Sequence, residues 1–435
     1  MTPSTSLSDA ALLSTQASDK EAWDLQQWLI YLNEIHPSNI ELGLERVSTV
    51  FNKLALNYAD KTVVTVAGTN GKGTTSALIE QGLLVAHKSV GVFSSPHLID
   101  YRERVRINGA MLPESAHCSA FLKVDQARGD VLLTYFEFGT LAALQLMFDA
   151  GVDYWLLEVG LGGRLDAVNI VDPDIAVITS IDLDHQDWLG HTKELIAKEK
   201  AGIFRSNIPA VIGEPEPPQS LKQAVVDYQV DARWQGVNFS YWVDEQGYHW
   251  QGEQRKFSGL PVPFIPLQNV STALEVIELL ALELTAESLK AVIQQTKLVG
   301  RRQIIQDKPM IMLDVAHNPQ ATRLLAADLR QENCKRILAV VGMLADKDIE
   351  QTLKPMQDIV DDWFCADLDV PRGAKASVLL SALQQSTVTY RNVQQAFLAA
   401  IKEARPEDCV IVFGSFFTIA DILNYTSNHL ISEEL

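Results

Sequence analysis

Short apolar runs alternate with stretches of helical periodicity along most of the chain, and many of the runs end in glycine or polar residues. The runs in the first half are rich in β-branched side chains, which favour strands. Strands that alternate with helices predict a mostly parallel, doubly wound α/β sheet. The expected strands of this sheet are residues 62–67, 90–93, 154–159, 175–180 and 210–213.

Other patterns flank this region. Apolar residues recur at helical spacing over 23–35 and 47–54, which predicts two helices before the first strand. Aromatic and polar residues alternate between about 231 and 263, with Gly247 and Gly252 as turn signals. This segment is predicted to form an antiparallel hairpin excursion.

A second alternation of strand-like and helical segments begins near residue 308. A chain of 435 residues is too long for one core at roughly 150 residues per domain, so we expect two or three domains. We place a larger domain at 21–299 and a smaller one at 300–435, after a loose N-terminal extension at 1–20. The expected strands of the smaller domain are 310–313, 337–341, 363–366 and 410–413.

The composition narrows the class of protein. The formal net charge of −19 argues against a general nucleic-acid or anionic-membrane surface. The N-terminus lacks the basic start and apolar core of a signal peptide, and no apolar run reaches the roughly 18 to 20 residues that span a bilayer. The four scattered cysteines predict reduced thiols. We expect a soluble, cytoplasmic protein.

The most informative motif follows the run at 62–67 and reads Gly68-Thr69-Asn70-Gly71-Lys72-Gly73-Thr74-Thr75. Glycines let backbone N–H groups converge on phosphate oxygens, and the following helix adds its positive N-terminal dipole. Lys72 would reach the β- and γ-phosphates, and Thr74 or Thr75 would offer a hydroxyl to a phosphate or to Mg²⁺. The spacing departs from the strict P-loop pattern. The alternative, a strand-to-helix turn that needs glycine only for its backbone angles, leaves Lys72 and the threonines unexplained.

Polar groups also follow the neighbouring strands, where ligands bind to such sheets. Glu158 ends one run and suits nucleotide-bound Mg²⁺, although a capping carboxylate is the alternative. His185 follows the run at 175–180 and is either a metal ligand or a solvated turn residue. Ser95 follows the run at 90–93. Lys198 and Lys200 belong to a mixed-charge helix, and their spacing does not distinguish a functional lysine from a solvated face.

Similar strand ends occur in the second half of the chain. Asp314 and His317 follow the run at 310–313, and Ser415 follows the run at 410–413. These positions predict that the smaller domain closes over the phosphate-binding edge of the larger one, with Arg301 at the joint near a phosphate.

The motif at 68–74 resembles the ATP loop of the Mur ligase superfamily, whose members join a carboxylate to an amino acid through an acyl phosphate. Within that superfamily the chain resembles the folylpolyglutamate synthase family from about residue 22 to about residue 425. The resemblance implies a Mur-ligase-like P-loop ATPase domain and a smaller, Rossmann-like C-terminal glutamate ligase domain. The motifs that carry it are 94–98, 133–137, 158–167, 184–185, 199–203, 300–301 and 314–319.

The resemblance also implies roles for single residues. It places catalytic roles at Lys72, His185, His317 and Lys200, the last as an N6-carboxylated lysine near the metals. It places ATP contacts at Thr69, Asn70, Gly71, Lys72, Gly73, Thr74, Asn269, Arg301 and Asp314. It places the metal ligands at Ser95, Glu158 and His185. It places substrate contacts at Glu41, Leu42, Gly43, Thr134, Tyr135, Phe136, Glu137, Leu165, Asp166 and Ala167, and, near the incoming glutamate, at Ser415.

The activity implied by the resemblance is the ATP-dependent addition of L-glutamate to 7,8-dihydropteroate and to reduced folates such as tetrahydrofolate. The substrate carboxylate attacks the γ-phosphate of ATP, and the glutamate amino group then displaces phosphate from the acyl phosphate. Mg²⁺, with two ions expected, is the implied cofactor, ATP is the cosubstrate, and K⁺ or another monovalent cation is a further candidate. We expect a monomer that acts on small molecules, without a nucleic-acid or membrane partner.

Two other functions share the ATP loop. A cell-wall Mur ligase acts on a UDP-linked muramyl substrate and carries a separate N-terminal domain, for which the roughly 60 residues before the loop are too few. A nucleotide-binding regulatory protein without ligase turnover would not need Glu158, His185 and Lys200 together.

Overall fold

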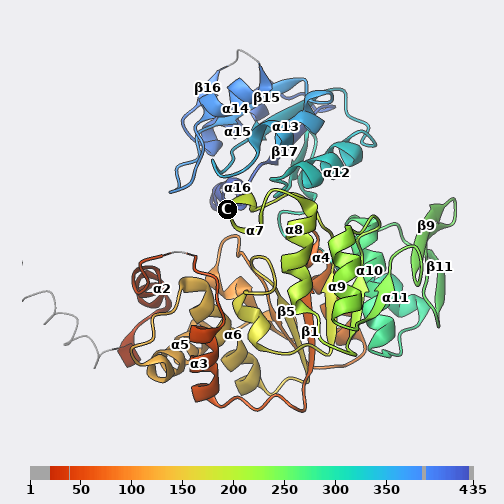
Figure 1. Ribbon diagram of the computed structural model, residues 1–435. Coiled ribbons are helices and arrows are strands. Elements are labelled where there is room, and N and C mark those ends of the chain that lie inside the picture. Colours follow the sequence, from red (N-terminus) through yellow and green to blue (C-terminus); the bar gives the residue numbers. More distant parts are fainter. Residues whose placement is uncertain (1–19, 39, 385–387, 431–435) are drawn as a thin grey trace, which may run out of the picture.

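Two α/β units make up the computed structural model, which describes residues 20–38, 40–384 and 388–430. The larger unit contains an eight-stranded sheet and the smaller unit a six-stranded sheet. The smaller unit lies above the carboxyl ends of the central strands of the larger one (Figure 1). The predicted extension at 1–20 lies outside the described residues except for Lys20, which begins the short helix η2 (Lys20–Ala22).

The large sheet has the strand order β4-β3-β2-β5-β1-β6-β7-β8. Strand β1 is central and pairs in parallel with both β5 and β6. The antiparallel pairs of this sheet are β2 with β3 and β3 with β4. The predicted mostly parallel, doubly wound sheet is therefore confirmed. The strands are β1 (Thr62–Ala67), β2 (Val90–Phe93), β3 (Val105–Ile107), β4 (Ala110–Met111), β5 (Tyr154–Glu158), β6 (Ile175–Ile178), β7 (Pro209–Ile212) and β8 (Asp231–Trp234).

The predicted antiparallel hairpin was wrong at its start, near residue 231. Residues 231–234 form β8, which adds to the large sheet in parallel with β7. As an edge strand, β8 has half-exposed residues and resembles a solvated hairpin strand in its pattern. The antiparallel excursion itself contains β9 (Ser240–Asp244), β10 (Gly247–Gln251) and β11 (Lys256–Leu260).

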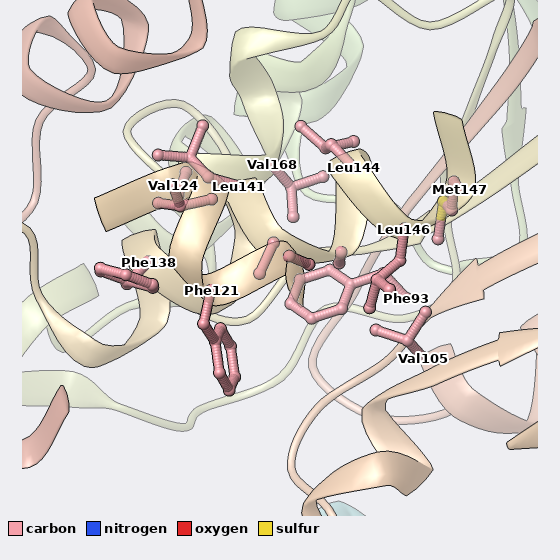
Figure 2. Packing of buried hydrophobic residues seen from close by; sticks show 14 of the residues in the cluster. Phe93, Val105, Phe121, Val124, Phe138, Leu141, Leu144, Leu146, Met147 and Val168 are labelled. Carbon is pink, nitrogen blue, oxygen red and sulfur yellow. The ribbon is translucent and has the colours of Figure 1, made fainter. Parts of the chain in front are cut away.

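Helices cover both faces of the large sheet. On one face, Phe93 of β2, Phe121 of α5 and Phe138 of α6 belong to one buried hydrophobic cluster (Figure 2). On the other face, Val64 and Val66 of β1 pack against α4, α10 and α11. The helices are α2 (Leu25–Glu34), α3 (Glu45–Leu54), α4 (Lys72–Val85), α5 (Glu114–Arg128), α6 (Tyr135–Ala150), α7 (Gln186–Leu189), α8 (Lys193–Lys200), α9 (Gln219–Asp227), α10 (Leu267–Leu279) and α11 (Ala286–Gln295), with η3 (Tyr101–Arg104), η4 (Ala167–Ile170) and η5 (Ala201–Ile203).

The small sheet has the order β12-β13-β17-β14-β15-β16 and is parallel except for β12. Helices α12, α13 and α14 cover one face, and α15 and α16 cover the other. The strands are β12 (Gln303–Asp307), β13 (Met310–Leu313), β14 (Ile337–Val341), β15 (Asp362–Ala366), β16 (Thr389–Tyr390) and β17 (Cys409–Phe413). The helices are α12 (Pro319–Leu329), α13 (Ile349–Gln357), α14 (Ala376–Leu383), α15 (Val393–Glu403) and α16 (Phe416–Leu430).

Two general features complete the fold. The four cysteines are free thiols, as predicted. Within the described ranges, no helix combines the length and the apolar character needed to cross a membrane.

Candidate active site between the two units

The phosphate loop joins the end of β1 to α4, whose N-cap is Gly71 in a left-handed conformation with φ of 87°. A Cβ atom at Gly71 would lie 2.4 Å from Oδ1 of Asn269, which is 6% exposed on α10. Thr69 fixes the start of the loop because its Oγ1 donates to the carbonyl oxygen of Asp182 over 3.0 Å. The structure therefore brings the predicted ATP contact Asn269 against the loop and requires glycine at position 71.

Two lysines converge beneath the loop. The Lys72 ammonium donates to the carbonyl oxygen of Gly68 over 2.9 Å, and the Lys200 amine donates to the same oxygen over 3.0 Å. Lys200 is 5% exposed at the end of α8. Burial and, after it, the nearby charge of Lys72 lower the pKa of Lys200 to about 7. An ordinary lysine is charged at neutral pH, whereas Lys200 is neutral in a large fraction of molecules.

Glu158 ends β5 beside β1 and is 5% exposed. Burial raises the pKa of its carboxyl group, while the charges of Lys72 and Arg301 oppose that shift. The backbone N–H of Ser95 donates to this carboxylate. In the described chain no side-chain donor hydrogen-bonds to Glu158, so its oxygens remain available to a cation. Carboxylate and hydroxyl oxygens are suitable Mg²⁺ ligands, and the residues present therefore fit a divalent ion.

His185 is the N-cap of α7 and has a left-handed backbone with φ of 50°. Burial lowers the pKa of its imidazole to about 4, so the ring is neutral, as a metal ligand must be. The preceding residue, Asp184, contacts the smaller unit, with its oxygens 2.5 Å from Lys347 Nζ and 3.5 Å from His317 Nε2. Although burial alone would raise the pKa of Asp184, its hydrogen bond with His317 and the charge of Lys347 hold that pKa well below its usual range.

Arg301 and Asp314 join this group from the smaller unit. The Arg301 guanidinium lies 5.1 Å from the centre of the Phe416 ring and interacts with the charges of Asp314 and Glu158. The Asp314 carboxylate accepts hydrogen bonds from the backbone N–H groups of Arg302 and Ala316, at 2.9 and 2.8 Å. These contacts hold Asp314 at the end of β13, beside Arg301.

The predicted acyl-substrate residues form a second group around the start of α6. Thr134 caps this helix, and its backbone N–H and hydroxyl both donate to the buried Glu137 carboxylate. Arg46 bridges Glu137, at 3.0 Å, and Glu41, so two predicted segments far apart in the chain meet. Phe136 packs against Gly160, where a Cβ atom would lie 2.5 Å from its ring.

Asp166 completes this group by accepting hydrogen bonds from the backbone N–H groups of Leu161 and Val168, at 2.8 and 3.0 Å. Burial raises the pKa of its carboxyl group to about 6. Ala167 is buried beside it. The other predicted contacts here, Leu42, Gly43, Leu165 and Tyr135, are partly exposed.

Ser415 stands apart from these groups. It is 3% exposed, and its hydroxyl hydrogen-bonds with Oγ1 of Thr418 over 2.8 Å. None of its hydrogen bonds within the described residues reaches another predicted site residue, so a contact between Ser415 and glutamate stays a prediction.

The sequence assigned no role to four residues that connect these groups. Arg46 links the acyl-substrate segments, and Lys347, Asn318 and Gln320 contact the larger unit. Asn318 could have been found, because an asparagine before a proline is a helix N-cap signal directly after a strand-end motif. Lys347 also follows a strand end, that of β14, where ligands gather. No local signal marks Arg46 or Gln320.

A glycine-rich loop, a buried acidic strand end and a second α/β unit over both define an ATP-dependent ligase of the Mur type. Two family models agree with this class: the Mur ligase middle domain matches residues 66–217, and the Mur ligase glutamate ligase domain matches residues 300–416. The chain is 46% identical to the dihydrofolate synthase/folylpolyglutamate synthase of Escherichia coli (strain K12), covering 92% of this chain and 94% of that one. The corresponding Haemophilus influenzae protein is 41% identical, covering 91% of this chain and 96% of that one. The chain belongs to the dihydrofolate synthase/folylpolyglutamate synthase family.

Comparison with solved structures supports the same family assignment. The E. coli FolC protein in complex with DHPP and ADP superimposes with a TM-score of 0.91 at 46% identity, covering 94% of this chain and 99% of that one. The bifunctional Yersinia pestis CO92 protein superimposes with a TM-score of 0.89 at 48% identity, with the same coverage. The family is therefore the folate branch of the superfamily, and not the cell-wall branch.

Gly71→Ala tests the phosphate loop. The added Cβ would displace Asn269 or the loop, so we expect kcat/KM for ATP to fall by about 100-fold, the typical cost of misplacing reacting groups by an ångström. Steady-state kinetics with varied ATP measures this loss. The control is Gly129→Ala, because Gly129 also has a positive φ of 56° but no described heavy atom lies within 4 Å of a Cβ there. Equal kinetics in the two variants would contradict the assignment of the loop.

Proposed function

We propose that this chain adds L-glutamate to the carboxylate of 7,8-dihydropteroate and of reduced folates such as tetrahydrofolate, with cleavage of ATP to ADP and phosphate. The observation that carries the proposal is the meeting of Lys72, Lys200 and Glu158 at a sheet edge contacted by the second unit. The E. coli relative has been solved with DHPP and ADP, and another bifunctional relative with Mn, AMPPNP and L-glutamate.

The reaction starts from the substrate carboxylate, which is a poor electrophile. A carboxylate oxygen of the substrate attacks the γ-phosphorus of ATP, the bond to the bridging oxygen breaks, and ADP departs. Lys72, the N-terminus of α4 and Arg301 stabilise the negative charge on the transferring phosphoryl group. The product is an acyl phosphate, which is activated toward amines.

Four side chains would hold magnesium at this site: Ser95 through its hydroxyl, Glu158 through its carboxylate, His185 through its neutral ring and Lys200 as a carbamate. The bound cation neutralises phosphate charge and acts as a Lewis acid. Carbamate formation converts Lys200 from a group that would repel Mg²⁺ into an anionic oxygen ligand. We assign two Mg²⁺ ions to the complex and retain K⁺ or another monovalent cation as a further candidate.

The acyl substrate would lie along the segments that contain Glu41, Phe136 and Asp166. The buried carboxylates of Glu137 and Asp166 suit the amino-substituted, N–H-rich edge of a pterin ring, and Phe136 offers an aromatic face. The ring would thus be held on the larger unit, with its carboxylate tail directed toward the phosphate loop.

L-Glutamate would enter between the units. A small cavity there is lined by Asp184, His185, His317, Asn318 and Lys347. His317 is held by the carbonyl oxygen of Val315, 2.8 Å from its Nδ1, so its ring is fixed at the cavity wall. The glutamate nitrogen attacks the acyl carbon, a tetrahedral intermediate forms, and phosphate leaves as the amide bond is completed. Contact between the units excludes water, which would hydrolyse the acyl phosphate.

We assign the enzyme to the cytoplasm as a monomer that acts on small molecules without nucleic-acid or membrane partners. The net charge of −19 supports the absence of nucleic-acid and anionic-membrane partners, because extended anionic surfaces would be repelled.

ADP release with ATP, Mg²⁺ and L-glutamate tests the proposal when the acceptor is varied. We expect turnover with dihydropteroate and with tetrahydrofolate, and none with a UDP-muramyl peptide, because the pterin-binding segments would not hold the peptide. Omission of L-glutamate should abolish amide formation. Turnover with the muramyl peptide alone would contradict the proposal.

Lys200→Ala tests the carbamate. We expect a loss of activity of about 100-fold or more, comparable to loss of a group that stabilises transition-state charge, and no rescue by bicarbonate. In the unaltered chain, incorporation of isotopically labelled bicarbonate at Lys200, followed by mass spectrometry, should rise with pH through about 7, because only the neutral amine attacks CO₂. The control is Lys198→Ala on the exposed face of the same helix, which should keep full activity. Full activity of Lys200→Ala would exclude this role.

A further inference from the structure

The side-chain amide of Asn70 hydrogen-bonds the phosphate loop to the smaller unit, and it forms a reciprocal pair with the amide of Asn318. Asn70 Nδ2 donates to Asn318 Oδ1 over 3.0 Å, and Asn318 Nδ2 donates back to Asn70 Oδ1 over 2.9 Å. The two residues are 248 positions apart in sequence. Asn70 belongs to the loop between β1 and α4, and Asn318 precedes α12, so the pair spans the two units directly at the site of phosphoryl transfer.

Neighbouring groups fix the orientation of both amides. Asn318 Oδ1 caps α12 by accepting from the Ala321 N–H over 3.0 Å, which turns its Nδ2 toward Asn70 and toward Asp184, 3.1 Å away. Asn70 Nδ2 donates its second hydrogen to Gln320 Oε1 over 2.5 Å. Each amide nitrogen thus uses both of its hydrogens, and Asn318 is only 2% exposed. A satisfied network of this kind, buried at Asn318 and partly buried at Asn70 and Gln320, favours a single arrangement of the groups it joins.

The same network reaches the backbone of the loop. The carbonyl oxygen of Asn70 accepts from Thr179 Oγ1 over 2.6 Å, and its N–H donates to Ser180 Oγ over 3.1 Å. The Ser180 hydroxyl also lies 3.2 Å from Gln320 Oε1. Residues 179 and 180 follow β6, so the loop is held between the end of that strand and the N-terminus of α12. A shift of the smaller unit would therefore move or release Asn70, which adjoins the phosphate-binding glycines.

We propose that Asn318 is a positioning residue for the ligase reaction, which hydrogen-bonds the phosphate loop through Asn70 when the smaller unit covers the site. This inference rests on the proposed function. Its consequence is that formation of the acyl phosphate is tied to the closed arrangement in which glutamate, rather than water, meets the acyl carbon. Loss of the amide pair would leave a loop that can cleave ATP while the site is open. Such an enzyme would release ADP without forming an equal amount of amide.

Asn318→Asp separates this role from helix capping. Aspartate is as good an N-cap as asparagine, so the bond from the Ala321 N–H is kept. The substitution replaces the donor that faces Asn70 Oδ1 and Asp184 Oδ2 by a negatively charged oxygen, which repels both. We expect amide formation to slow by about tenfold or more, since leaving buried acceptors unpaired is costly. We also expect the ratio of ADP to amide to rise clearly above the value of the unaltered enzyme.

The matched control is Asn392→Asp. Asn392 caps α15 in the same unit, with its Oδ1 accepting from the Gln395 N–H over 2.9 Å. Within the part of the chain that the structure describes, its side chain makes no hydrogen bond to the larger unit. We expect Asn392→Asp to keep the rate and the ratio of ADP to amide of the unaltered enzyme.

A second pair of variants serves if Asn318→Asp does not fold. Gln320→Glu keeps an acceptor oxygen toward Asn70 and Ser180 and should preserve the ratio, whereas Gln320→Met removes that acceptor and should raise it. The inference is overturned if Asn318→Asp has the same ratio of ADP to amide as Asn392→Asp, or, failing that, if the two Gln320 variants have equal ratios. The proposed function fails separately, if the unaltered enzyme releases no ADP with either folate substrate.

Discussion

The carbonyl oxygen of Gly68 receives hydrogen bonds from two lysines, and the chemistry of the site depends on this convergence. Two ammonium groups that share one buried acceptor repel each other and lose hydration, so one of them gives up its proton easily. Burial and, after it, the charge of Lys72 lower the pKa of Lys200 to about 7, and burial also lowers the pKa of Lys72, a shift that the charges of Glu158 and Asp184 oppose. In the proposed mechanism Lys72 binds phosphate as a cation, and the neutral amine of Lys200 reacts with CO₂.

The topology explains why these groups meet. Strand β1 lies between β5 and β6, so the loop after β1, the acid at the end of β5 and the turn after β6 reach one edge of the large sheet. The small sheet brings the end of β13 and the N-terminus of α12 to the same place. Each unit thus supplies part of the candidate site, the larger one the predicted phosphate and acyl-substrate residues and the smaller one Arg301, Asp314, His317 and Lys347. Contacts such as that between Asp184 and Lys347 hold the parts together.

Much of the fold could be predicted because its central strands are continuous apolar runs with clear ends. Strands β1, β2, β13 and β14 have the predicted bounds. The edge strands β4, β8, β12 and β16, and β3 next to β4, were missed or misassigned, since they are short or half exposed and lack a continuous apolar signal. The site could be predicted only in part for a similar reason. Strand-end residues such as Glu158 follow from topology, and the family resemblance singled out Lys200. The bonds from Asn70 to Asn318 and Gln320 depend on how two units pack, which no local pattern in the chain records.

In the proposed reaction, the substrate carboxylate is activated as an acyl phosphate at the Gly68 loop before glutamate attacks it. Transfer of an isotopically labelled carboxylate oxygen from dihydropteroate tests this most directly. The account predicts that each amide bond formed places one labelled oxygen in the released inorganic phosphate, because the oxygen that attacks ATP leaves with the phosphoryl group. Phosphate that carries no label, at normal amide yield, would contradict it.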